Sequence, residues 1–390
     1  MQFAFAVLAL LVSITLQSAA GSNNGRINST ATNARAATID VKIDAVGDVM
    51  MGWRVSALVQ TDGTDAPFKQ AHATLVQADA IVGNLECPLS DRGKPTKSKS
   101  AKDLKARKEF LLRGTPAAAA GLAHAGFAAL TLANNHILDY GKNALDDTLE
   151  ALHDNGIATA GAGDDAALAW QPAFFERRGV RFALLGVSEV IPRGYGATAH
   201  AAGVAPGRDP STGDVTAAYL HTLAHAIRMA RTNADVVIVY EHWGTELLST
   251  PTADHIRLAH AAIDAGASIV LGAHPHVLGP VEAYHGGLIA YSLGNFIFDT
   301  QPGIQTRSAV LEISLHGQTV SSWRAVPMLL EQGVPRPAAG PDAAYIQQLL
   351  SGQAASIPPA TPAPPVARAP ATAHGHDLAA QHPAAHGPPQ

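Results

Sequence analysis

Residues 39–52 have the sequence IDVKIDAVGDVMMG, in which a strand candidate, Ile39–Val46, leads directly to the carboxylate of Asp48 between Gly47 and Gly52. Short apolar segments of this kind recur along the chain and alternate with longer segments of helical pattern. That alternation is typical of parallel strands buried beneath helices. The sequence therefore predicts a layered α/β or α+β fold.

The remaining elements follow from the same alternation. We expect further strands at 80–82, 128–132, 236–240 and 268–271, a hairpin over 173–187 that turns at Arg178 and Gly179, and strand pairs at 281–292 and 309–326. Helices are expected near 68–77, 116–125, 144–155, 215–232 and 252–265. Together they predict one folded domain over residues 38–333.

The two ends of the chain have a different composition. Residues 3–16 are apolar and are followed by Ser18, Ala19 and Ala20, which predicts a signal peptide over 1–20 and places the mature protein in the periplasm or outside the cell. An uncleaved membrane anchor is the alternative. Residues 21–37 look like a linker, and residues 334–390, rich in Pro, Ala, Gln and His, predict a disordered tail in which only 345–350 could form a helix.

Composition excludes some classes of protein. With 27 basic and 32 acidic residues among 390, the chain lacks the positive charge of a nucleic-acid-binding protein. A single cysteine, Cys87, rules out an intrachain disulfide. Residues 90–113 are locally basic and form either a solvated surface or a rim that attracts an anionic substrate; the basic residues are Arg92, Lys94, Lys97, Lys99, Lys102, Lys105, Arg107, Lys108 and Arg113.

Polar side chains follow five of the predicted strands, where ligand sites form in sheets of this kind. Each strand delivers a carboxylate, an amide or an imidazole, and the candidates are Asp48, Glu86, Asn135, His136, Asp139, His242, His274 and His276. Mixed oxygen and nitrogen ligands suit Mn, Fe or Zn better than Ca. We therefore expect a centre of two divalent metal ions.

These motifs, from Gly47–Gly52 to the closing sequence Tyr291-Ser292-Leu293-Gly294-Asn295-Phe296, resemble the CapA family of bacterial capsule and poly-γ-glutamate synthesis proteins, which is similar to calcineurin-like metallophosphoesterases. The resemblance covers about residues 40–330. It implies a four-layer α/β/β/α sandwich with two metals at strand ends. By this resemblance Asn135, His242, His274 and His276 are metal ligands, and His136 is an acid beside the substrate.

Two positions depart from the phosphoesterase pattern. Met50 stands where the first motif has a histidine, so one ligand is lost. The second motif has Asn84 and Glu86 in place of Gly-Asp followed by Arg. We assign the bridging carboxylate to Glu86, because a ligand shared by two cations is favoured when it is anionic, and place Asn84 beside the ligands. Cys87 is expected to be a packing residue rather than a ligand.

Two classes of function remain open at this stage. The first is an extracytoplasmic metal-dependent hydrolase of a phosphoester or an anionic polymer, with His136 as acid and Asp139 as its orienting partner. The second is a non-catalytic component that binds nascent polymer and assists its export within a membrane-bound capsule synthase complex. The third possibility is an export-directed α/β domain whose metal site is vestigial.

Overall fold

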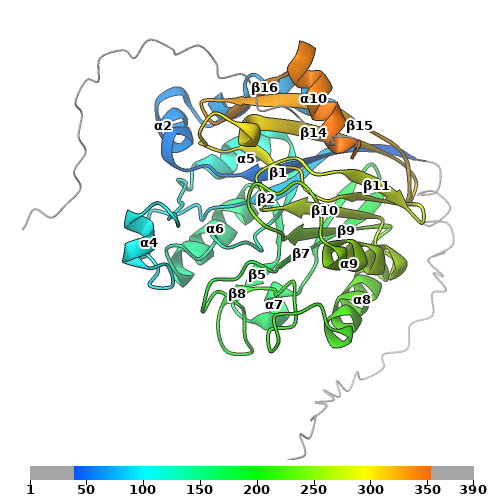
Figure 1. Cartoon of the computed structure of the whole chain (residues 1–390), viewed down its shortest axis with the longest axis horizontal. Helices are drawn as coiled ribbons and strands as arrows, with labels where there is room; N and C mark the ends of the chain where they lie inside the picture. Colours follow the sequence, from blue (N-terminus) through cyan, green and yellow to red (C-terminus); the bar gives the residue numbers. More distant parts are fainter. Residues whose placement is uncertain (1–38, 353–390) are drawn as a thin grey trace, which may run out of the picture. The chain divides into compact units, whose positions relative to one another are not determined.

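The computed structural model describes residues 39–352 (Figure 1). The predicted signal peptide, the linker and the part of the predicted tail after residue 352 lie outside the described residues. Within 39–352, no helix is long and apolar enough to cross a membrane.

The larger sheet has eight strands, and one of them is the first predicted strand, which leads to Asp48. Its parallel half consists of β1 (Asp40–Val49), β2 (Ala80–Leu85), β3 (Phe127–Thr131) and β4 (Ala158–Ala160). On the other side of β1 it continues antiparallel through β14 (Arg307–His316), β15 (Thr319–Glu331) and β16 (Val334–Pro337). A short strand, β13 (Asn295–Ile297), pairs with the end of β1.

The second sheet has six strands in the order β11 (Val281–Tyr284), β12 (Gly287–Ala290), β10 (Ile269–Ala273), β9 (Val236–His242), β7 (Val180–Ser188) and β6 (Ala173–Arg177). The central strands β7, β9, β10 and β12 run parallel, and β6–β7 is the predicted hairpin. A two-stranded sheet joins β5 (Ala162–Gly163) to β8 (Gly203–Val204).

Helices cover the outer face of each sheet, which confirms the four-layer sandwich. α5 (Ala118–Ala125) and α6 (Lys142–Asp154) pack against β3 and β4. α8 (Ala217–Arg231) and α9 (Ala253–Asp264) pack against the second sheet (Figure 1). Thr216 and Thr252 cap α8 and α9 by accepting hydrogen bonds from backbone amides, which fixes where these helices begin. Between the sheets, the Tyr240 hydroxyl donates to the carbonyl of Val46 at 2.6 Å.

The remaining helices are short, and several of them were not predicted; the longest of these is α2. α2 (Trp53–Asp62) begins directly after the Asp48 turn, whereas the helix expected near 68–77 is reduced to α3. α2 buries only Val55 and Val59, so its apolar pattern is weak. The other short helices are η1 (Ala66–Phe68), α3 (His72–Leu75), α4 (Ala101–Lys105), α7 (Ala166–Ala169) and η2 (Ile304–Thr306).

The composition predicted that the folded unit ends at residue 333, but the structure shows a further strand and a further helix. β16 pairs with β15, and α10 (Gly340–Leu350) packs on β14 and β15. Ile346 and Leu350 are buried there, and the Gln347 side chain donates to the Ala325 carbonyl at 2.9 Å. The few apolar residues of this segment are sufficient because an existing sheet supplies the surface they cover.

Candidate metal centre

The carboxyl ends of strands from both sheets meet at one place. β1 carries Asp48, β9 carries His242, and Glu86 directly follows β2. His274 and His276 follow β10. Because the strands within each group are parallel and the two sheets face each other, side chains far apart in the sequence converge.

Two overlapping sets of ligand atoms result. Atoms of Glu86, His242 and His274 all lie within 4.8 Å of one another, and atoms of Asp48, Glu86 and His276 do so as well. Glu86 belongs to both sets, which is the arrangement expected of a carboxylate between two cations. The sixth predicted ligand, Asn135, places its Oδ1 2.9 Å from Nε2 of His242.

Unpartnered atoms test whether cations fit this cluster. Both carboxylate oxygens of Glu86 and Nδ1 of His274 are buried and have no hydrogen-bond partner among the described residues. Such groups are rare in folded proteins, because desolvation without a compensating bond is costly. Carboxylate oxygen and imidazole nitrogen are common donors to divalent transition metals. The residues therefore fit a pair of such ions.

Amide side chains hold the candidate ligands in place. Asn84 donates to Oδ1 of Asp48 at 2.8 Å and accepts a hydrogen bond from Asn134 at 3.0 Å. The position expected for Asn84, beside the ligands, is therefore observed. Oδ1 of Asn295 lies 2.8 Å from Nδ1 of His276. The sequence contained Asn295 only as part of the closing motif, and its contact with His276 was not predicted.

A glycine permits this last contact. A Cβ atom at Gly47 would lie 1.9 Å from the carbonyl oxygen of Gly294, so no larger residue fits between Asp48 and the loop that carries Asn295. Gly294 itself has a φ of 59°, in the left-handed region. The two glycines of these motifs therefore allow one close approach of backbone to backbone.

Burial and charge set the protonation of the cluster. Burial, together with the nearby Asp48 carboxylate, raises the pKa of Glu86 well above its usual range. Burial also lowers the pKa of His242, and lowers that of His274 to about 3, so both imidazoles are neutral, as metal binding requires. Burial alone would lower the pKa of His276, but the carboxylates of Glu86 and Asp48 outweigh it and raise that pKa to about 10.

The departures from the phosphoesterase pattern have local explanations. Met50 is buried, and its sulfur accepts a hydrogen bond from the Gly52 amide at 3.0 Å. Met50 thus closes its own turn instead of joining the cluster. Cys87 is buried and accepts from the Met51 amide, and burial raises the pKa of its thiol to about 12. Both observations agree with a packing role for Cys87.

Asp139 orients His136 and does not face a cavity. Its Oδ2 lies 2.7 Å from Nδ1 of His136 and accepts from the Leu112 amide at 2.7 Å. Its Oδ1 accepts from the Lys99 ammonium at 2.5 Å and from the Tyr195 hydroxyl at 2.9 Å. Burial alone would raise the pKa of Asp139, but bonds from His136 and Lys99 hold it below its usual range. Asp139 is therefore a positioning residue.

Lys99 corrects the prediction for the basic segment. Its ammonium is buried, lies 2.9 Å from Nδ1 of His136, and also donates to the Phe110 carbonyl. Burial lowers its pKa. Arg92, also in this segment, pairs with Asp147 on α6. Neither residue is part of a free cationic rim, whereas Lys94, Lys97, Lys102, Lys105, Arg107 and Lys108 are exposed.

Two cavities adjoin the cluster, and His136 lines both. One, of about 640 Å³, also contains His276, Asn295, Trp53 and Phe110. The other, of about 740 Å³, is bordered by Asn135, His274 and several basic residues, among them Lys108, Arg193 and Arg208. A substrate can therefore approach the cluster from two sides.

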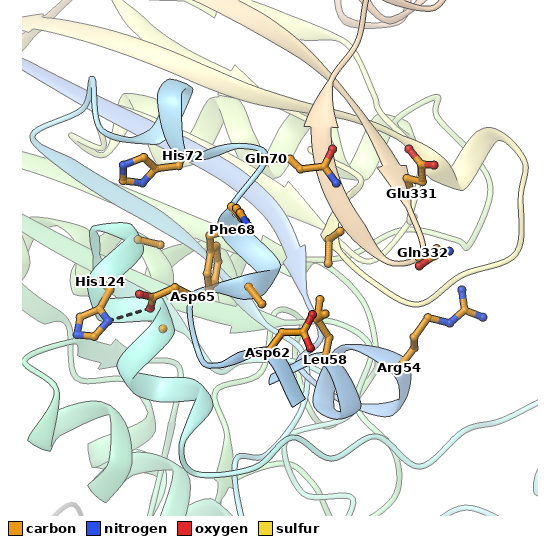
Figure 2. Close-up of a pocket in the computed structure, with 15 residues that line it drawn as sticks. Arg54, Leu58, Asp62, Asp65, Phe68, Gln70, His72, His124, Glu331 and Gln332 are labelled. Carbon is orange, nitrogen blue, oxygen red and sulfur yellow. Dashed lines mark hydrogen bonds and ion pairs between the residues drawn. The ribbon is translucent and has the colours of Figure 1, made fainter. Parts of the chain in front are cut away.

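A third cavity, of about 820 Å³, contains none of the predicted site residues (Figure 2). Its wall carries an ion pair in which Nδ1 of His124 lies 2.8 Å from Asp65, and both side chains are exposed. His72 and Glu331 lie apart from that pair in the same view. We assign no chemistry to this cavity.

Known bacterial proteins are similar to this chain in sequence. The chain is 35% identical over 295 residues to the capsule biosynthesis protein CapA of Bacillus anthracis, covering 75% of this chain and 68% of that protein. It is 34% identical over 294 residues to the PGA biosynthesis protein CapA of Bacillus subtilis, covering 75% and 72%. A solved structure of a hypothetical protein from Thermus thermophilus superposes with a TM-score of 0.44 at 16% identity, covering 74% of this chain and 100% of that one. Residues 42–300 match the family described as bacterial capsule synthesis protein PGA_cap. The chain therefore belongs to the PGA_cap family of bacterial capsule synthesis proteins.

Proposed function

We propose that this protein is a metal-dependent hydrolase of a phosphoester or of an anionic polymer, acting in capsule or poly-γ-glutamate biosynthesis. The observation that supports the proposal most directly is Glu86, whose two buried oxygens lack a partner and which is shared by both ligand sets. Two cations bound there would stabilise negative charge on the substrate and lower the pKa of a water molecule. The names of the Bacillus relatives support the biosynthetic context.

The chain's own residues supply proton transfer and orientation. Nδ1 of His136 is held by Asp139, which leaves Nε2 for the cavities and for donation of a proton to the leaving oxygen. Lys99 and Tyr195 hold Asp139 in turn. Asn295 contacts Nδ1 of His276, so Nε2 of that ring is the nitrogen left for a cation.

We propose further that the enzyme acts outside the cytoplasm, next to a membrane-bound synthase complex. The apolar segment at 3–16 supports export. Anionic polymer and synthase subunits are the expected partners.

A non-catalytic role in polymer binding and export is the alternative. It is favoured by Met50, which replaces a ligand of the phosphoesterase pattern and instead bonds to the Gly52 amide. Such a protein would use the same cations to hold an anionic chain.

Metal content and turnover together test the proposal. Wild-type protein should contain divalent metal by elemental analysis and should hydrolyse a chromogenic phosphodiester, bis(p-nitrophenyl) phosphate, with loss of activity after chelation. His136→Ala should keep its metal and lose about 10²–10⁴-fold in kcat, the contribution typical of a general acid. His153→Ala, which changes an exposed histidine on α6, is the matched control.

The two functions predict different results. Bound metal without hydrolysis of phosphoesters or of poly-γ-glutamate would favour the binding role. Full activity of the His136→Ala variant would show that His136 is not the general acid.

A further inference from the structure

Two exposed aromatic side chains line the cavity on the His276 side of the cluster. Trp53 and Phe110 are 42% and 44% exposed, and their rings meet edge to face with centroids 5.6 Å apart. They come from separate segments, Trp53 from the start of α2 and Phe110 from the loop that Lys99 anchors beside Asp139. Large aromatic residues usually gain stability by burial, so this exposed pair in a cavity indicates a surface for a ligand.

The backbone at Trp53 supports this interpretation independently. Its φ is 51°, in the left-handed region that bulky side chains rarely occupy. Conformations of this kind cost free energy and are concentrated at functional sites. Trp53 remains 42% exposed in this conformation, which places an indole ring in the wall that also contains His136 and His276.

The other lining residues define what could rest on these rings. Apart from the histidines, the charged side chains are balanced, since Arg54 and Arg107 are matched by Glu246 and Asp299, and the Arg54 guanidinium lies 3.8 Å from Asp299. Away from the metal cluster, the wall therefore offers a long polyanion no excess of arginine or lysine. An acyl chain would have to desolvate these charged groups and the neighbouring amides, which is costly.

Amide and hydroxyl side chains complete the wall. They are Thr300, Gln301 and Gln305. Such groups both donate and accept hydrogen bonds, and so pair well with hydroxyl groups. A sugar ring combines the two requirements, since one face of carbon-bound hydrogens rests on aromatic rings while its hydroxyls face outward.

We propose that this cavity is a sugar subsite, so that the substrate is a glycosyl phosphoester whose ring rests on Trp53 and Phe110 while its phosphate lies at the metal cluster. The placement of the phosphate rests on the proposed function, whereas sugar binding does not.

Neutral sugars test the subsite without metal or turnover. The full chain, treated with chelator, is titrated with the methyl glycosides of glucose, galactose and N-acetylglucosamine and with cyclohexanol, and binding is followed by saturation-transfer NMR and tryptophan fluorescence. We expect at least one glycoside to bind at least tenfold more tightly than cyclohexanol. If none does, or if cyclohexanol binds equally well, the sugar subsite is wrong.

Variants assign the binding to the aromatic pair. Trp53→Asn removes the ring and introduces a residue that tolerates positive φ, which offsets part of the packing that is lost, and a thermal melt checks that the variant is folded. This variant and Phe110→Ala should each weaken glycoside binding at least tenfold. Trp323→Ala, which removes a comparably exposed tryptophan on β15, should leave binding unchanged. Wild-type affinity in a folded Trp53→Asn protein would overturn the assignment.

Two phosphorylated ligands then test whether the sugar subsite and the metal cluster bind parts of the same molecule. With metal bound, glucose 1-phosphate should bind at least tenfold more tightly than methyl phosphate, and Trp53→Asn should remove that difference without changing the affinity for methyl phosphate. Equal binding of the two phosphates to the wild type would contradict the joined site. Absence of bound metal or of turnover would contradict the proposed function while leaving the neutral-sugar result intact.

Discussion

Two buried carboxylates, Glu86 and Asp139, belong to the same site and have opposite surroundings. Asp139 accepts hydrogen bonds at both oxygens from Lys99, Tyr195 and the Leu112 amide, and it contacts His136. Glu86 has no hydrogen-bond partner within the described residues. The pKa of Asp139 is held down by its donors, and the pKa of Glu86 is raised by burial. The comparison separates a carboxylate that the protein satisfies itself from one whose oxygens the described residues leave without a partner.

Glu86→Gln should have the largest effect, and it tests the carboxylate that has no hydrogen-bond partner. Removal of the shared anionic ligand should abolish stoichiometric metal binding and reduce turnover by roughly 10³-fold or more. In the presence of chelator, however, the variant should melt no lower than the wild type, because the raised pKa leaves Glu86 protonated without metal and the exchange then replaces one neutral group that lacks partners with another. Elemental analysis and thermal melts with and without chelator measure both effects, and Glu331→Gln, at an exposed position, is the control. A melting temperature below that of chelated wild type would refute the interpretation of Glu86 as an unsatisfied group.

Asp139→Asn tests the other carboxylate, whose oxygens both accept hydrogen bonds. It leaves the Lys99 ammonium buried without its anion, and breaking a buried ion pair in this way costs about 3–5 kcal/mol of stability. Metal content should be unchanged. Denaturant unfolding measures the loss, and a second change, Lys99→Met, should restore much of it; if the double variant is no more stable than Asp139→Asn, the pair does not act as a unit.

A third buried carboxylate, Asp44, sharpens the comparison, because its oxygens also lack partners but no imidazole faces it. Burial and the neighbouring Glu312 raise its pKa to about 7, while Lys42 and Arg324 partly offset them. A raised pKa in the folded state means that stability is highest below pH 4 and falls as pH rises through 7. The fall reaches at most about 4 kcal/mol, by roughly 1.4 kcal/mol per pKa unit.

Asp44→Asn should remove this slope. Unfolding free energies of wild type and variant, measured between pH 4 and 8.5, should differ least near pH 4 and most above pH 7, with the variant more stable. Parallel curves would show that Asp44 does not titrate in this range.

Tyr195→Phe should have the smallest effect. It removes one of the donors to Asp139 and leaves Lys99, Leu112 and His136 in place. The expected cost is about 1 kcal/mol in stability, with metal content retained. If Tyr195→Phe lost as much stability as Asp139→Asn, the Tyr195 hydroxyl rather than the ion pair with Lys99 would be the main interaction that stabilises Asp139.

Local sequence pattern predicted most of the architecture and the strand ends at which the candidate ligands lie. The β6–β7 hairpin and the strand ends at Asp48, His242 and His274 follow from short-range signals, namely turn residues and apolar runs that end in polar groups. Residues that act through tertiary contacts were missed. Nothing around Lys99 in the sequence indicates that its ammonium pairs with Asp139, since a lysine in a basic segment is usually solvated.

The C-terminal boundary was missed for a related reason. β16 contains Pro335 and Pro337 and lies at the edge of its sheet, where prolines are tolerated. Its composition alone is that of a tail. α2 was missed because a helix with two buried residues has little apolar periodicity.

The contact between Gly47 and Gly294 has a consequence for how the site is assembled. Asp48 lies near the beginning of the folded chain, whereas Asn295, which orients His276, arrives only with β13 near its end. A nascent polypeptide that stops short of β13 already contains every candidate ligand, but it lacks the side chain that orients His276, so the complete site forms only after β13 has been made. If the protein crosses a membrane before folding, the ions available in the compartment of arrival, and not those of the cytosol, decide which cations it acquires.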